Sequence, residues 1–316
     1  MKISRAKLYS FPVRAETEWL ILEIFSECNQ KGFSELTMSN YSKNNQLEIA
    51  LNKSLKKLSG IEIYNDHQIS ELIHNEEAYT NLAIATSISG IRSACLDIFA
   101  KKESKSMKEY LKNLFSLRSS SLNRIKLYAN INRSLLPDNS GPVDRSPKAF
   151  TNMAKKAISD GFSHIKCAPF DNYPNNFYQN NNFINEGLIR VNEITKILTK
   201  EQELLVDCHS KFDFDSSVAT EKKLFNMGVN WFEEPMNPKN SSKELKSLKK
   251  FIKGNLVGGE EFFGIKKFLD LLNSKTLDIL MPDVKYCGGL AEATRIGKEL
   301  GKISQHSFSI HCPSGP

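Results

Sequence analysis

The chain has 316 residues, enough to bury a large core in one large domain or in a barrel with a smaller partner domain. Its 40% hydrophobic and 25% charged residues are ordinary for a soluble globular protein, and no stretch approaches about 18 uninterrupted apolar residues, so no membrane span is expected. The net charge of +7 comes from scattered lysines; the densest run, 246–253, reads as a solvated helix face, and no nucleic-acid partner is expected.

Cysteine usage and the N-terminus indicate where the protein works. None of the six cysteines forms a C-x-x-C pair, and several lie in apolar, strand-like runs where a free thiol behaves as a small hydrophobe. The first seven residues lack the apolar core of a signal peptide. We therefore expect a reduced, cytoplasmic protein without a disulfide framework.

Residues 1–123 are predicted to form an α+β domain. The segment 19–25 is strand-like and is followed by a turn and by Gly32-Phe33-Ser34-Glu35. The pattern becomes helical from about Leu47 to Leu114, and residues 89–99 place apolar groups at helix-face spacing.

Residues 124–316 alternate between strand-like and helical segments. Helices are expected between the strands, for example over 147–159 and 290–300. This alternation is typical of a parallel barrel or a doubly wound sheet. The seven predicted strands are 125–129, 164–166, 204–209, 231–234, 256–260, 279–283 and 308–311.

Three carboxylates stand at nearly even intervals at the ends of predicted strands. Asp207, Glu233 and Glu260 are separated by 26 and 27 residues, about the length of one strand, one helix and two loops. The carboxyl ends of successive barrel strands converge on one mouth, where three acids would repel each other unless a cation held them. The spacing therefore predicts a site for a hard divalent cation such as Mg²⁺.

Strand alternation places a histidine on the same face as one of these acids. Successive side chains point to opposite faces of a strand, so Asp207 and His209 share a face and Cys208 lies on the other. The same argument does not choose between Glu233 and Glu234, or between Glu260 and Glu261.

Taken in order, these segments resemble the enolase superfamily, specifically its mandelate racemase/muconate lactonizing group, over nearly the whole chain. Residues 32–35 look like the family's G-x-G-E turn, with Ser34 in place of the second glycine. The strand-end acids are similar to its three metal ligands, and the resemblance selects Glu233 and Glu260 from the two Glu pairs. The segments Pro282-Asp283-Val284 and Cys287-Gly288-Gly289 look like its sixth-strand motif. The resemblance implies an α/β fold: a modified TIM barrel, (β/α)7β-like and cut short after the seventh strand, with an N-terminal α+β capping domain.

Two motifs look like those of the acid-sugar dehydratases, with galactonate dehydratase closest in style. One is the D-x-H at 207–209, and the other is His311-Cys312-Pro313-Ser314-Gly315-Pro316, similar to an H-x-P-x-G-P on the seventh strand. They imply loss of water from a sugar acid, which gives a 2-keto-3-deoxy acid. The implied partner is a small acid-sugar molecule, and a homo-oligomer is expected.

Within this resemblance the remaining residues receive roles. His209 is expected to be the general base that takes the proton next to the substrate carboxylate, because the pKa of histidine lies near neutrality. His311 is expected to protonate the departing hydroxyl, with Asp283 orienting its imidazole. Lys166 is expected to help neutralise the carboxylate or enediolate charge.

The sequence also departs from the wider group. At 166–168 the second lysine of a K-x-K motif is absent, which disfavours mandelate racemase-like chemistry that uses this lysine as a base. The chain stops after the seventh predicted strand, so we expect an open strand edge and reduced stability or turnover. A racemase or epimerase on the same site, and a member that binds without turnover, stay open as alternatives.

Overall fold

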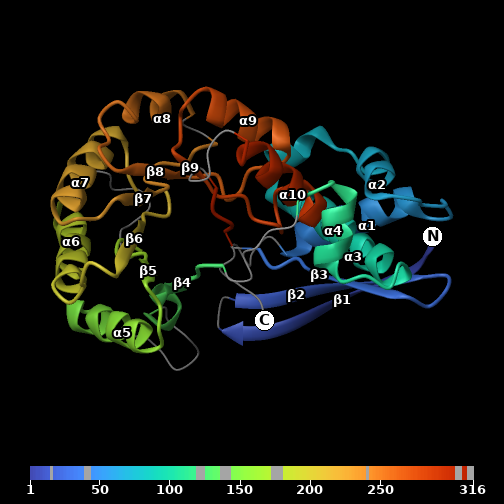
Figure 1. Ribbon diagram of the computed structural model, residues 1–316, viewed down its shortest axis with the longest axis horizontal. Helices are drawn as coiled ribbons and strands as arrows, with labels where there is room; N and C mark the ends of the chain where they lie inside the picture. The colour runs from blue at the N-terminus through green and yellow to red at the C-terminus, as the bar shows by residue number, and fades with distance from the viewer. Residues whose placement is uncertain are drawn as a thin grey trace. The chain divides into compact units, whose positions relative to one another are not determined.

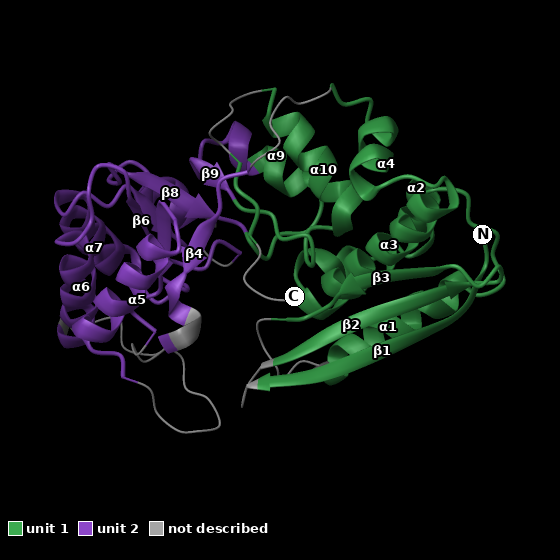
Figure 2. Ribbon diagram, turned by 60° about the horizontal axis from the view of Figure 1, so that its bottom comes forward, with its two compact units in different colours: residues 1–121, 260–270, 281–316 green, residues 122–259, 271–280 purple. Residues whose placement is uncertain are grey.

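The computed structural model describes residues 1–14, 17–38, 44–118, 125–135, 144–171, 181–239, 242–302 and 308–311. The chain divides into two compact units (Figure 2). Unit 1 comprises residues 1–121, 260–270 and 281–316, and unit 2 comprises residues 122–259 and 271–280. A three-stranded sheet belongs to unit 1, and a six-stranded sheet belongs to unit 2.

Unit 1 combines an antiparallel sheet with helices, which agrees with the α+β class expected for the N-terminal region (Figure 1). The sheet has the order β1-β2-β3, and the long first two strands form a hairpin. The strands are β1 (Ile3–Arg14), β2 (Thr17–Ser26) and β3 (Lys31–Glu35); the helices are α1 (Asn44–Leu58), α2 (Asp66–Leu72), the short 3₁₀ helix η2 (Glu76–Tyr79), α3 (Leu82–Lys102), α4 (Met107–Leu114) and α10 (Gly289–Leu300).

Helix α3 lies at the centre of the unit 1 core. Asn81 caps its first turn by accepting hydrogen bonds from the backbone N–H groups of Ala83 at 3.0 Å and Ile84 at 3.3 Å. Ile88 and Ile91 are fully buried in the same hydrophobic cluster as the β2 residues Leu22 and Ile24. By length and composition α3 is also a candidate to cross a membrane, but 89% of its apolar window is buried inside the protein, as in a core helix.

The motif at 32–35 is a strand and not the expected turn. Ser34 and Gly32 pair with Leu22 and Ile24 across β2. A Cβ atom at Gly32 would lie 1.9 Å from the carbonyl oxygen of Ala94, so only glycine permits this close approach to α3. The turn prediction was wrong because the glycine serves packing between strand and helix instead of chain reversal.

Unit 2 contains a parallel sheet in which the spatial order of the strands is their chain order, β4-β5-β6-β7-β8-β9 (Figure 1). Helices alternate with the strands, which confirms the predicted TIM-barrel-like α/β fold. The strands are β4 (Tyr128–Asn130), β5 (His164–Cys167), β6 (Glu203–Asp207), β7 (Trp231–Glu233), β8 (Asn255–Gly258) and β9 (Ile279–Leu280); the helices are η3 (Ile131–Leu135), α5 (Pro147–Ser159), α6 (Asn181–Thr195), α7 (Phe214–Asn226), α8 (Ser242–Leu248) and α9 (Ile265–Asn273), which begins in unit 1 and ends in unit 2.

Some of the seven predicted strands are shorter than the sequence pattern suggested. The first begins only at Tyr128, because Ile125 and Leu127, with 86% and 68% of their surface exposed, have no strand partner in the described ladder. Of the last, the structure describes 308–311, where His311 forms a parallel bridge with Asp283.

The segment at 288–290 is hydrogen-bonded to helix α3. The Ser89 and Ser93 hydroxyls accept hydrogen bonds from the backbone N–H groups of Gly288 at 2.9 Å and Leu290 at 3.1 Å. Gly289 has a φ of +87°, and a Cβ there would lie 2.7 Å from the Ser89 carbonyl oxygen. These contacts group 281–302 with the N-terminal residues in space, while the sequence boundary between 123 and 124 stays a prediction.

Candidate active site

Three charged residues lie side by side where β5, β6 and β7 end. Lys166 is the penultimate residue of β5, and Asp207 and Glu233 are the last residues of β6 and β7 and pair with each other in register. Their exposed fractions are 2%, 3% and 1%. The strands are short and their interiors are apolar, so burial of these groups follows directly from their position in the sheet.

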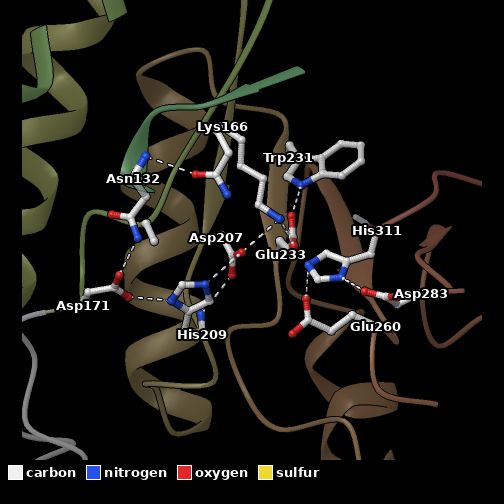
Figure 3. Close-up of polar contacts among 12 residues, drawn as sticks. Asn132, Lys166, Asp171, Asp207, His209, Trp231, Glu233, Glu260, Asp283 and His311 are labelled. Carbon is white, nitrogen blue, oxygen red and sulfur yellow. Dashed lines mark hydrogen bonds and ion pairs between the residues drawn. The ribbon is translucent and has the colours of Figure 1, made fainter. Parts of the chain in front are cut away.

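The ammonium group of Lys166 compensates both carboxylates (Figure 3). Its Nζ lies 3.0 Å from Asp207 Oδ2 and also contacts Glu233 Oε1. The indole Nε1 of Trp231 donates a hydrogen bond of 2.8 Å to Glu233 Oε2. Buried charges are tolerated only when they are paired and hydrogen-bonded, and this trio meets that condition within unit 2. The Lys166 position agrees with its expected charge-neutralising role, and the sequence analysis did not identify Trp231.

His209 reaches Asp207 by a route different from the predicted strand alternation. Strand β6 ends at Asp207, and His209 has a φ of +46°, in the left-handed region that a non-glycine residue rarely adopts. Its backbone N–H donates to Asp207 Oδ1 at 3.0 Å, and its Nε2 lies 3.2 Å from Asp207 Oδ2. The alternation argument was therefore wrong, although the two side chains do meet. Such strained residues cluster at functional sites.

The other ring nitrogen of His209 contacts a carboxylate that the sequence analysis missed. Nδ1 lies 2.6 Å from Asp171 Oδ1, and Asp171 Oδ2 accepts a hydrogen bond of 2.7 Å from Asn132 Nδ2. Asp171 follows β5 at the start of the Asn-rich segment, where no motif marks it. Its nearness to the end of β5, five positions after Lys166, was the only available signal.

Neighbouring charges shift the pKa values of Asp207 and His209 in opposite directions. Burial raises the pKa of Asp207, but the charges of His209 and Lys166 outweigh it, so the pKa lies well below its usual range. Burial lowers the pKa of His209, but the Asp207 charge and the hydrogen bond to Asp171 outweigh it, and that pKa lies well above its ordinary value. Asp207 therefore stays ionised beside Lys166 and His209.

The structure also separates Glu233 from its neighbour Glu234. Glu234 has a φ of +37°, and its Oε1 accepts a hydrogen bond of 2.9 Å from the backbone N–H of Gly259. It thus holds the end of β8, while Glu233 contacts Lys166. Glu260 follows Gly259 directly, so its backbone is tied to the same end of the strand.

A second polar group lies within unit 1 (Figure 3). His311 Nε2 lies 2.7 Å from Glu260 Oε2, and His311 Nδ1 lies 2.9 Å from Asp283 Oδ2. Asp283 and His311 are buried, with 1% and 6% of their surface exposed, and form the isolated backbone bridge. The backbone N–H of Lys285 donates to Asp283 Oδ1 at 2.7 Å. The structure thus pairs Asp283 with His311, as expected for an orienting carboxylate; residues 312–316 of that motif lie outside the described residues.

The donor atoms suit a hard divalent cation. Asp207 and Glu233 offer carboxylate oxygens from neighbouring strand ends, and Glu260 offers another, which is the ligand chemistry that Mg²⁺ favours. The first two lie in unit 2 and the third in unit 1, so a common site for all three stays a prediction.

Two curated proteins that are named as sugar-acid dehydratases are similar in sequence to parts of this chain. A D-gluconate/D-galactonate dehydratase of Picrophilus torridus is 25% identical over 151 residues, which cover 48% of this chain and 38% of the relative. A D-gluconate dehydratase of Thermoproteus tenax is 23% identical over 241 residues, which cover 73% of this chain and 43% of the relative. The matched region thus spans about two fifths of the length of these curated relatives.

The fold and the family agree. A crystal structure of a member of the enolase superfamily from Salmonella Typhimurium superposes with a TM-score of 0.82 over 99% of this chain and 82% of that chain, and at 20% identity this likeness concerns the fold. The family model described as Enolase C-terminal domain-like matches residues 149–316, more than half of the chain. The protein therefore belongs to the Enolase C-terminal domain-like family.

Proposed function

We propose that this protein is a Mg²⁺-dependent dehydratase that removes water from a sugar acid and yields a 2-keto-3-deoxy acid. The observation that carries the proposal is a repeated arrangement: each of two imidazoles lies between two carboxylates. His209 has Asp171 and Asp207, and His311 has Asp283 and Glu260. The names of the dehydratase relatives support the same class of reaction.

In this proposal Asp207, Glu233 and Glu260 hold the cation. When bound, it supplies Lewis-acid stabilisation of the negative charge that develops on the substrate carboxylate. Lys166 lies against two of these ligands and keeps their charge compensated. The buried Asp207 and Glu233 carboxylates are acceptor-only when ionised, so they need such a cationic partner to stay buried.

The two histidines divide the proton transfers. His209 takes the proton from the carbon next to the carboxylate, and the electrons of that C–H bond delocalise onto the carboxylate as an enediolate. The C–O bond to the neighbouring hydroxyl then breaks, and His311 supplies the proton that lets the oxygen leave as water. Asp283 holds His311 Nδ1, which leaves its Nε2 to exchange the proton. The remaining enol rearranges to the keto acid.

A second candidate is a racemase or epimerase of a carboxylate substrate. The equivalent surroundings of His209 and His311 favour it, because removal of a proton by one imidazole and its return by the other needs two bases of the same kind. The mass of the product separates the two functions, since epimerisation conserves mass and dehydration removes one water.

The remaining expectations complete the proposal. The five described cysteines are free, which supports a reducing, cytoplasmic setting. The substrate is a dissolved small molecule, and we propose that the protein works as a homo-oligomer.

A library of sugar acids with Mg²⁺, assayed for 2-keto acid formation and for product mass, tests the function. We expect at least one acid to lose water, and a His209→Asn, His311→Asn double variant to be inactive. A product of unchanged mass would establish the epimerase instead. Binding of an acid without any conversion would establish a non-catalytic member and overturn the proposal.

A further inference from the structure

Asp171 belongs to a chain of hydrogen bonds in which the donor and the acceptor of each bond can be assigned. The guanidinium group of Arg145 can only donate, and it does so to Asn132 Oδ1 at 3.2 Å and to the carbonyl oxygens of Leu135 at 3.0 Å and Ala168 at 2.9 Å. The Asn132 amide must therefore present its oxygen to Arg145 and its NH₂ group to Asp171, at 2.7 Å. This argument settles the orientation of an amide whose nitrogen and oxygen are otherwise interchangeable.

The direction continues to the imidazole. The ionised Asp171 carboxylate only accepts, so its Oδ2 takes the Asn132 hydrogen bond and its Oδ1 takes one from His209 Nδ1 at 2.6 Å. His209 Nδ1 thus carries a proton whether the imidazole is neutral or protonated, so Nε2 is the ring nitrogen that can release and accept one. The second carboxylate, Asp207, lies on this Nε2 side at 3.2 Å.

The backbone before Asp171 is held by buried groups. Arg190 is 6% exposed, and its guanidinium donates to the carbonyl oxygen of Pro169 at 2.7 Å and to that of Arg145 at 2.8 Å. The Asp171 side chain is itself only 16% exposed, whereas that of His209 is 43% exposed. The carboxylate is therefore the fixed partner, and it restrains the more accessible imidazole that stands on a strained backbone.

We propose that Asp171 is a positioning residue that fixes the tautomer and the orientation of His209 through the relay Arg145–Asn132–Asp171. The catalytic consequence rests on the proposed function, because it assumes that His209 Nε2 exchanges a proton with the substrate. A carboxylate that holds the remote ring nitrogen keeps an imidazole in the tautomer that its reaction needs.

The direction of the relay gives a test with nearly isosteric substitutions. In Asp171→Asn, the oxygen of the new amide must face the Asn132 NH₂ group, so its own NH₂ group faces His209 Nδ1. The variant therefore moves the His209 proton from Nδ1 to Nε2. Adding Asn132→Asp reverses the direction of these hydrogen bonds. The carboxylate at position 132 accepts from Arg145 and from the NH₂ group of the amide at position 171. The oxygen of that amide then faces His209 Nδ1 and accepts its hydrogen bond. The double variant restores the original tautomer.

Two readouts are measured on the full chain with Mg²⁺. The first is the ¹⁵N chemical shift of the histidine ring nitrogens, with His209 assigned by its absence from His209→Asn. The second is kcat and KM for a sugar acid that the wild type converts. The matched control is Asp160→Asn, an exposed aspartate that pairs with Lys156 at 2.9 Å.

We expect Asp171→Asn to invert the tautomer and to lower kcat by about 10²- to 10⁴-fold with little change in KM. The double variant should recover at least about tenfold of that loss, and the control should change neither quantity.

The outcomes separate the two proposals. An inverted tautomer in Asp171→Asn that is restored in the double variant upholds the role of Asp171 in positioning His209, and absence of turnover in the wild type would then overturn only the dehydratase function. An unchanged tautomer overturns the inference, and a wild type that dehydrates a sugar acid keeps the proposed function. A loss of kcat that the double variant does not recover, with its tautomer restored, also overturns the catalytic consequence.

Discussion

Lys166 Nζ lies 3.0 Å from Asp207 Oδ2, and the two side chains are 3% and 4% exposed. A carboxylate in such surroundings keeps its charge only because cationic partners compensate it, and the low pKa of Asp207 reflects the balance between burial and those partners. A pair of this kind is a weak source of stability when it is intact, but loss of one partner leaves a buried charge alone.

Replacement of Lys166 by Met should therefore destabilise the protein strongly. Lys166→Met leaves Asp207 and Glu233 next to each other without the ammonium, and we expect the free energy of unfolding to fall by about 3–5 kcal/mol in urea titrations with EDTA. Mg²⁺ should recover part of the loss, because a cation that binds only the folded state stabilises it. Lys156→Met, on an exposed helix face, is the control and should change stability by less than about 0.5 kcal/mol. Equal, small effects of both variants would show that Lys166 does not compensate these acids.

Trp231 should report cation binding directly. Its indole donates to Glu233 Oε2, so a cation that binds this carboxylate changes the polarity around one of only two tryptophans in the chain. After treatment with EDTA, titration with Mg²⁺ should give a saturable change in fluorescence that Trp231→Phe removes. Glu233→Gln should abolish the saturation.

The matched control for this titration is Glu234→Gln. It alters the adjacent carboxylate, whose Oε1 accepts a hydrogen bond from the Gly259 N–H. The same substitutions at Glu260 and Glu261 extend the test to the predicted third ligand. A titration curve that Asp207→Asn, Glu233→Gln and Glu260→Gln all leave unchanged would refute the predicted metal site.

A buried arginine should matter most for the integrity of unit 1. Arg92 donates to Asp66 at 2.9 and 2.7 Å and lies 3.3 Å from Glu292 Oε2, so it joins helices α2, α3 and α10. Arg92→Met removes the guanidinium that pairs with the buried Asp66, while Glu292 keeps its contact with Arg295. We expect a loss of about 3–5 kcal/mol in the free energy of unfolding.

Arg295→Met removes a different partner of the same Glu292 and is the control. Arg295 is 39% exposed, so its ion pair is screened by solvent, and we expect a loss of less than about 1 kcal/mol from urea unfolding. Comparable losses in the two variants would contradict the view that burial of Arg92 decides its contribution.

The sequence was sufficient where a local pattern determines the structure. Helix α5 occupies 147–159 as predicted, because Ser146 caps it, Pro147 suits its first turn and its apolar residues recur at helical spacing. Asp207 and Glu233 lie at strand ends as predicted, because alternation of strand and helix fixes their interval.

The sequence was insufficient where contacts join distant or irregular segments. Asp171 meets His209 across 38 positions, after the chain has left β5, and no local pattern encodes that contact. The left-handed φ of His209 depends on hydrogen bonds such as that from the Ser210 N–H to the Glu234 carbonyl oxygen at 2.7 Å. Alternation along a strand cannot anticipate a backbone that turns at its last residue.

Exchange of the substrate α-proton should identify the general base. His209→Asn removes the imidazole from unit 2 and leaves the carboxylates of Asp207 and Glu233 in place, so the variant should fold and bind Mg²⁺ as judged by the Trp231 signal. It should abolish exchange of the α-proton with solvent deuterium, followed by NMR of the sugar acid. His311→Asn should retain exchange but form product more slowly, because it lacks the acid that assists departure of the hydroxyl.

The control for this experiment is His67→Asn, since the His67 side chain is 78% exposed and lies 3.7 Å from Glu71 on the surface of unit 1. Its exchange rate should match the wild type. Because each of the two imidazoles proposed as catalytic lies between two carboxylates, the contacts alone do not rank them as bases, and the exchange measurement decides. Exchange at the wild-type rate in His209→Asn, with its loss in His311→Asn, would reverse the two roles. Exchange that persists in both variants would transfer the role of base to Lys166, whose ammonium would then have to lose its proton despite contact with two carboxylates.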